Sequence, residues 1–129
     1  MVYDSVQKRG ILFGGYGNYP EIFNDTWSYD VTNNLWTELD SKTNPTKRVG
    51  HAMAYDSRSQ KVIMFGGAGL DLNKPYNDTW VFNSSENTWI NMDALIKEKY
   101  NSIPNHSFLL TLGALFCTIY LIERKKMIK

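Results

Sequence analysis

The side chains best suited to chemistry in this sequence are two aspartates, two histidines and one cysteine: Asp25, Asp78, His51, His106 and Cys117. Paired carboxylates can act in general acid–base catalysis when they converge on one site. Asp25 and Asp78, however, occupy the same place in two copies of the tetrapeptide Asn-Asp-Thr-Trp. Residues repeated in this way usually maintain the repeat, so we expect both carboxylates to accept hydrogen bonds from backbone N–H groups of their turns.

The remaining candidates do not form a metal site by spacing. His51 has no second ligand at a suitable distance along the chain, and His106 stands at the edge of an apolar C-terminal run. Cys117 is the sole cysteine and lies inside that run, so it forms no disulfide within the chain and is expected to act as a small apolar side chain. We predict no catalytic residue, no metal and no cofactor.

Two glycine pairs raise the alternative of a phosphate-binding loop. Such a loop leads from several glycines into a helix, often through Lys followed by Ser or Thr. Here the pairs Gly14-Gly15 and Gly66-Gly67 are flanked by strand-like runs instead. We therefore expect the glycines to provide positive φ angles and close approach of a neighbouring chain at the end of a strand.

These motifs belong to an internal repeat with an offset of 52 residues, and of 53 after the glycine pair. The first unit matches the second in three segments: 1–5 with 53–57 (MVYDS, MAYDS), 11–15 with 63–67 (ILFGG, IMFGG) and 24–27 with 77–80 (NDTW in both). The runs MAYD, KVIMFGG, TWVFN and TWINM of the second unit are rich in strand-forming residues and separated by turn residues. Four short strands at a period near fifty are typical of a propeller blade.

The repeat resembles the kelch repeat, in which a hydrophobic run, a glycine pair, an aromatic residue and a later Trp follow at fixed spacing. Pro45, Arg48, Gly50 and His51 also resemble the kelch lead-in to the innermost strand. The resemblance covers about residues 1–92 and implies that the motif residues are structural, with the four tryptophans filling the space between adjacent blades. These residues are Gly14, Gly15, Trp27, Trp36, Arg48, Gly50, His51, Gly66, Gly67, Trp80 and Trp89.

The resemblance implies an all-β fold of two kelch-type four-stranded blades of an incomplete β-propeller, and the apolar C-terminal run predicts one transmembrane α-helix after them. Kelch propellers close a ring of several blades, and the first unit lacks its lead-in and most of its innermost strand. We therefore expect a fragment, a degenerate gene product, or a protomer that self-associates or gains further blades. The expected boundaries are repeat 1 at 1–40, repeat 2 at 41–92, a polar stalk at 93–104, the transmembrane helix at 105–122 and a basic cytoplasmic tail at 123–129.

The membrane segment rests on the run from Phe108 to Ile122, which contains no charged residue. Its fifteen residues would span about 23 Å as a helix, at about 1.5 Å per residue. Adding residues 105–107 gives about 27 Å, against a hydrocarbon core of about 30 Å that can thin locally. A buried core helix is the alternative, but two blades offer no core for a helix that is apolar on all faces.

The basic tail predicts the orientation, because positive charges remain on the cytoplasmic side. Arg124, Lys125, Lys126 and Lys129 would then lie in the cytoplasm and the kelch region outside, in a single-pass membrane protein. The short apolar helix with a basic end also resembles the C-terminal anchors of archaeal surface proteins. Residues 1–10 (MVYDSVQKRG) lack the apolar core of a signal peptide.

These features predict a cell-surface module that binds a protein or glycan partner, with specificity in the loops 16–23 and 68–76 that differ most between the repeats. A net charge of +1 gives no reason to expect a nucleic acid partner. One alternative is a truncated remnant of a longer kelch protein without independent function. Another is a fragment of a galactose-oxidase-like enzyme, which we disfavour because a copper site of that kind needs several ligands beyond one cysteine in an apolar run.

Overall fold

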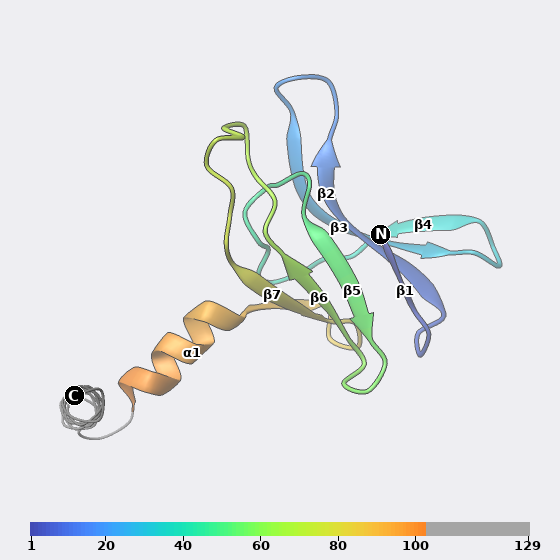
Figure 1. Cartoon of the computed structure of the whole chain (residues 1–129). Coiled ribbons are helices and arrows are strands. Elements are labelled where there is room, and N and C mark those ends of the chain that lie inside the picture. Colours follow the sequence, from blue (N-terminus) through green and yellow to red (C-terminus); the bar gives the residue numbers. More distant parts are fainter. Residues whose placement is uncertain (103–129) are drawn as a thin grey trace, which may run out of the picture. The chain divides into compact units, whose positions relative to one another are not determined.

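The computed structural model describes residues 1–102 as two four-stranded antiparallel sheets and one helix (Figure 1). In each sheet the strands neighbour one another in the order of the chain. The first blade contains β1 (Val2–Asp4), β2 (Arg9–Tyr16), β3 (Ile22–Asp30) and β4 (Leu35–Glu38). The second blade contains β5 (Ala52–Asp56), β6 (Lys61–Phe65), β7 (Thr79–Asn83) and β8 (Thr88–Asn91). The two blades predicted from the repeat are therefore present, and the first strand of the first blade is shortened to three residues rather than largely missing.

Four short hairpin turns have the same chemistry, which explains why the strands end where they do. Each turn begins with an Asp or Asn whose side-chain oxygen accepts a hydrogen bond from the backbone N–H two residues later, at 2.8–3.2 Å. Each ends four residues later in the left-handed region, at φ between 50° and 57°. The four turns run from Asp4 to Lys8, Asp30 to Asn34, Asp56 to Gln60 and Asn83 to Asn87. Asp and Asn favour such turns because their side chains replace a backbone acceptor.

The hydrophobic core lies between the two blades. Alternate residues of a strand point to opposite faces of its sheet, so one face of each blade can be apolar. The first blade contributes Ile11 and Phe13 from β2 and Leu39 after β4, and the second contributes Val62, Met64, Phe82 and Trp89. The blades hold each other because each covers the apolar face of its neighbour.

Helix α1 (Met92–Asn101) follows β8 directly and occupies most of the segment expected to be a polar stalk. The Asn91 side chain accepts a hydrogen bond from Ala94 N at 3.0 Å, as an N-terminal cap does. The blades belong to a compact unit, Met1–Leu95, and a second unit begins at Ile96. Across residues 1–102, no helix has the length and apolar character needed to cross a membrane. The expected transmembrane segment, 105–122, lies outside the described residues.

Candidate interaction site

The lead-in, residues 45–51, is the segment that positions the candidate site. It bonds to the first blade through Arg48, whose N donates to Phe23 O at 3.2 Å and whose O accepts from Gly15 N at 3.1 Å. The next residue, Val49, exchanges two hydrogen bonds of 2.9 Å with Ala68 of the second blade. The lead-in therefore joins both blades at the ends of their glycine-pair strands.

The glycine pairs make room for this crossing. A Cβ on Gly14 would lie 2.8 Å from Arg48 O, and a Cβ on Gly67 would lie 2.7 Å from Val49 O, both too close for any side chain. Their φ angles are +56° and +85°, in the left-handed region that only glycine adopts at low cost. Gly15, Gly66 and Gly50 also have positive φ, but an added Cβ would meet no serious clash there.

Arg48 fixes the lead-in by a buried charge pair with Asp78. Its side chain is 0% exposed, and its two terminal nitrogens donate to the two carboxylate oxygens of Asp78 at 2.6 and 2.8 Å. The same guanidinium donates to Gly66 O at 2.7 Å and to Thr46 O at 3.0 Å, and lies 4.5 Å from the ring centre of Tyr76. Hydrogen bonding to Arg48 lowers the pKa of Asp78 below its ordinary value, although burial opposes the shift.

The aspartates of the repeated turn differ from expectation in their donors. We expected backbone N–H groups, but Asp78 also accepts from the indole Nε1 of Trp80 at 2.7 Å, and Asp25 accepts from Trp27 Nε1 at 2.6 Å. The side-chain donors reach the carboxylates because Asp and Trp are two residues apart, within β3 for Asp25 and across the start of β7 for Asp78, so that both side chains point to the same side. The two carboxylates stabilise the blades and do not converge on one site.

The tryptophans have different environments in the two blades. Trp89 is 2% exposed and lies between the blades, with its ring centre 5.1 Å from that of Phe13 and its Nε1 donating to Thr26 Oγ1 at 2.9 Å. Trp80 packs against the same core. Trp36 holds the position of Trp89 in the first blade. It is 45% exposed and packs on Tyr29 of its own blade, because within the described chain no further blade covers its side of the sheet.

His51 packs edge-on against Phe13, with ring centres 5.7 Å apart. Burial, then repulsion from the N-terminus and Arg48, lowers its pKa below the ordinary value, so the ring is neutral at pH 7. Within residues 1–102, no group of three or more His, Cys, Asp or Glu side chains is placed to hold a metal. His106 and Cys117 lie outside the described residues.

An open apolar hollow lies between the two loops that the sequence singled out for specificity. Both loops, β2–β3 and β6–β7, project from the same end of the blades in Figure 1. The hollow between them, which we call the loop groove, has a volume of about 310 Å³. Its lining combines exposed apolar side chains with a single carboxylate: Tyr16, Gly17, Tyr19, Pro20, Glu21, Ile22, Val49, Gly69, Leu70 and Leu72. The lead-in contributes Val49 to the lining, and the preceding residue, Arg48, anchors the lead-in through its charge pair with Asp78.

Each loop of the groove has internal hydrogen bonds. In the first, Gly17 N donates to Glu21 O at 3.2 Å and Glu21 N to Asn18 O at 2.8 Å. In the second, Tyr76 N donates to Gly67 O at 2.7 Å, and Asp71 pairs with Lys74 at 3.2 Å. These bonds hold the exposed Tyr19, Leu70 and Leu72 outward without burying them.

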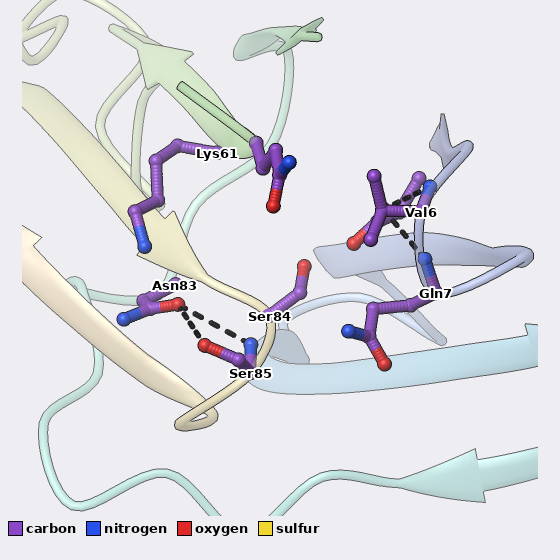
Figure 2. Close-up of a pocket in the computed structure, with 8 residues that line it drawn as sticks. Val6, Gln7, Lys61, Asn83, Ser84 and Ser85 are labelled. Atoms are coloured by element: carbon purple, nitrogen blue, oxygen red, sulfur yellow. Dashed lines mark hydrogen bonds between the residues drawn. The ribbon is translucent and has the colours of Figure 1, made fainter. Parts of the chain in front are cut away.

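A second, smaller cavity lies at the opposite end of the seam between the blades. Figure 2 shows Val6 and Gln7 of the first blade facing Asn83, Ser84 and Ser85 of the second. Its volume is about 40 Å³, room for one or two waters and too little for a ligand. Asp4 lines this cavity and is buried, which alone raises its pKa. The nearby Ser84 hydroxyl, the N–H groups of Gln7 and Val6 and the Tyr55 hydroxyl together outweigh burial and lower the pKa, and the two hydroxyls act without well-directed hydrogen bonds.

The sequence did not show which residues of the kelch motif pair with one another. Its pattern placed Arg48 with the lead-in and Asp78 with the turn, and it did not show that the two form one charge pair. The contribution of Pro20, Leu70 and Leu72 to a groove required the loops to be placed side by side.

Comparison with known proteins agrees with this geometry. Residues 1–117 match the KLHDC2/KLHL20/DRC7 Kelch-repeats domain. The chain is 30% identical over 95 residues to Mei4-dependent protein 6 of Schizosaccharomyces pombe and 32% identical over 76 residues to Host cell factor homolog hcf-1 of Caenorhabditis elegans. It is 35% identical over 93 residues to the Dynein alpha chain, flagellar outer arm, of Chlamydomonas reinhardtii.

These alignments cover 69%, 55% and 67% of this chain but only 13%, 10% and 2% of the three relatives. The chain therefore spans a small part of each relative it matches. All three relatives are eukaryotic proteins, and they give no support to the resemblance of the tail to archaeal anchors. The matched repeat domain and the two four-stranded blades show that this chain belongs to the kelch-repeat family.

Proposed function

We propose that this chain is a protein-binding module, and that the loop groove receives apolar side chains of a partner protein. The observation that carries the proposal is the hollow of about 310 Å³ between two structured loops. Exposed apolar side chains gathered in one place mark interaction sites, because they leave water only when a partner covers them. Tyr16, Tyr19, Leu70 and Leu72 are all exposed at its rim.

The chemistry of the groove favours a protein over a glycan and binding over catalysis. Sugar recognition requires several polar side chains to satisfy hydroxyl groups, and Glu21 is the one carboxylate in the lining. The tyrosines of the lining would contribute large contact areas, as they do in protein interfaces. No member of the lining is paired with a base or a second acid among the described contacts, so the groove lacks the arrangement that general acid–base catalysis requires.

The test is selection of peptides from a displayed random library on the full chain in mild detergent. Peptides that use the groove should contain aromatic or aliphatic residues and should lose binding to Leu72→Glu. Ile96→Glu places the same charge at a comparably exposed apolar residue of α1, which does not line the groove, and should retain binding. Peptides that bind both variants equally, or glycan binding that is lost with Leu72→Glu while no peptide is selected, would overturn the assignment.

We also propose that residues 105–122 anchor the chain in a membrane, with the kelch region outside the cell and residues 123–129 in the cytoplasm. The support is the uncharged run 108–122 followed by four basic residues in the last seven. The full chain should stay with membranes during extraction with alkaline carbonate. A chain truncated before Asn105 should be released from them. Continued membrane association of the truncated chain would contradict the anchor, and digestion of the kelch region by protease added to the cytoplasmic side would contradict the orientation.

A further inference from the structure

The interface between the blades has two unlike surfaces, and the repeat duplicates both of them. We call the first blade's surface at this interface face A, with Ile11, Phe13 and Thr26, and the second blade's surface face B, with Met64, Phe82 and Trp89. With the offset of 52, and of 53 after the glycine pair, the second blade carries its own face A and the first blade its own face B. Neither of these two copies is covered within the described chain.

The free face A has the residues of the covered one. Ile63 and Phe65 replace Ile11 and Phe13, and Thr79 replaces Thr26. Ile11 and Phe13 are buried, whereas Ile63 is 38% and Phe65 54% exposed. An apolar strand face of this kind is covered by a neighbouring blade in the first unit, whereas in the second no blade of the described residues covers it and Asp93 reaches its edge, accepting from Thr79 N at 2.9 Å.

The free face B also matches its covered counterpart. Leu12, Tyr29 and Trp36 occupy the positions of Met64, Phe82 and Trp89. Gly10 replaces Val62, and the Met1 side chain lies over it, with its sulfur 3.3 Å from the position that a Cβ would take. Beside them lies a hollow of about 410 Å³ lined by Met1, Val2, Tyr3, Gly10, Tyr29 and Val31, where an incoming apolar side chain can enter.

The polar contacts across the covered interface have counterparts as well. Trp89 Nε1 donates to Thr26 Oγ1 at 2.9 Å, and the equivalent pair on the free faces is Trp36 with Thr79.

Arg9 crosses the interface to Ser84 O at 2.7 Å and to Asn87 Oδ1 at 3.2 Å. The equivalent cation is Lys61, and the equivalent acceptors are Val31 O and the side chain of Asn34. Asn34 and Asn87 share the same left-handed backbone, at φ 51° and 50°. The Asn34 Oδ1 also accepts from the Tyr29 hydroxyl at 3.0 Å, so Lys61 would share this acceptor with Tyr29.

We propose that the free face B of the first blade binds the free face A of the second blade in another copy of this chain. The contact repeats the interface already present between the two blades, with Phe65 against Trp36 and Lys61 reaching Val31 O and Asn34. The bonds that the lead-in makes through Arg48 and Val49 have no counterpart in this contact, so it is weaker than the internal one. Because the two faces differ, the association is head-to-tail and leads to a closed ring or a growing array.

The test is the protein mass of the full chain in mild detergent, measured by light scattering over a range of concentrations. The wild type should rise above the 14.9 kDa of one chain as concentration increases. Trp36→Glu blocks face B and Phe65→Glu blocks face A, and each variant alone should stay at one chain. Both side chains are substantially exposed, so a thermal unfolding curve close to wild type is expected and is checked first.

Mixing the two variants distinguishes head-to-tail pairing from other association. Trp36→Glu retains an intact face A and Phe65→Glu an intact face B, so the mixture should form a one-to-one pair and stop there. Val6→Glu, which lies on neither free face, should associate like the wild type. A wild type that stays at one chain, variants that associate like the wild type through another segment, or a mixture without pairs would each overturn the proposal.

Discussion

Replacing Asp78 by Asn tests whether the charge pair between Arg48 and Asp78 holds the second blade to its lead-in. The amide introduced by Asp78→Asn would still accept one hydrogen bond, but it would not neutralise Arg48, whose side chain is 0% exposed. Removing one partner of a buried ion pair costs about 3–5 kcal/mol, because the other charge stays buried. Since 24% of the Asp78 side chain is exposed, water compensates in part, and we expect about 3 kcal/mol off the free energy of unfolding.

The repeat supplies the matched control. Asp25 holds the equivalent position and accepts from Trp27, but within residues 1–102 no arginine pairs with it. Asp25→Asn should therefore cost about 1 kcal/mol, the usual contribution of one hydrogen bond. The measurement is urea unfolding of the full chain in mild detergent, followed by tryptophan fluorescence. Equal losses for Asp78→Asn and Asp25→Asn would refute the argument that Arg48 makes the difference.

The same pair predicts a pH dependence with a definite sign. Hydrogen bonding to Arg48 holds the pKa of Asp78 below its ordinary 3.8, so the unfolded chain binds this proton at a higher pH than the folded chain does. Its contribution to stability is complete above that ordinary pKa and is lost as pH falls through the lower, folded value. The stability difference between wild type and Asp78→Asn should shrink as pH falls from 5 to about 2. A difference that stays constant over this range would contradict the pairing.

Three further tests, with five substitutions, address the packing between and within the blades. Trp89→Ala should cost about 3–5 kcal/mol in urea unfolding because the ring is buried between the blades, whereas the half-exposed Trp36→Ala should cost less than about 1 kcal/mol; similar losses would mean that Trp36 is equally covered. Gly67→Ala should destabilise more than Gly50→Ala in thermal unfolding, because both need positive φ but only the first meets a backbone oxygen at 2.7 Å; equal melting temperatures would remove the role assigned to close approach. Arg9→Met should cost about 1–3 kcal/mol in urea unfolding by leaving two acceptors of the second blade without their donor; an unchanged unfolding midpoint would show that this cross-blade contact contributes nothing.

The sequence predicted the blades because both units carry the same strand and turn residues at the same spacing. The positive φ angles and close backbone approach at the glycine pairs were also predicted, because a glycine pair at the end of a strand usually serves backbone geometry. The charge pair of Arg48 and Asp78 was not predicted, because thirty residues of chain separate them and only the crossing of the lead-in brings them together. The exposure of Trp36 was not predictable for a related reason: its type follows the repeat, but its burial depends on a neighbouring blade.

The loop groove shows the same limit. Its lining comes from two loops and the lead-in, and spacing along the chain does not show that Tyr19 and Leu72 border one hollow. The sequence indicated only that these loops vary between the repeats, which is typical of segments that carry specificity. Chain topology, rather than any local pattern, makes them one surface.

The lead-in has a consequence for how the kelch region comes apart. Consecutive residues, Arg48 and Val49, are bonded to different blades, so neither blade can open at its glycine-pair strand without releasing the other. The two sheets should then behave as one cooperative unit, with the amide hydrogens of Gly15 and Ala68 exchanging with solvent at closely similar rates. A short connection thereby takes over part of the coupling that, in a longer array of blades, would be shared among many interfaces.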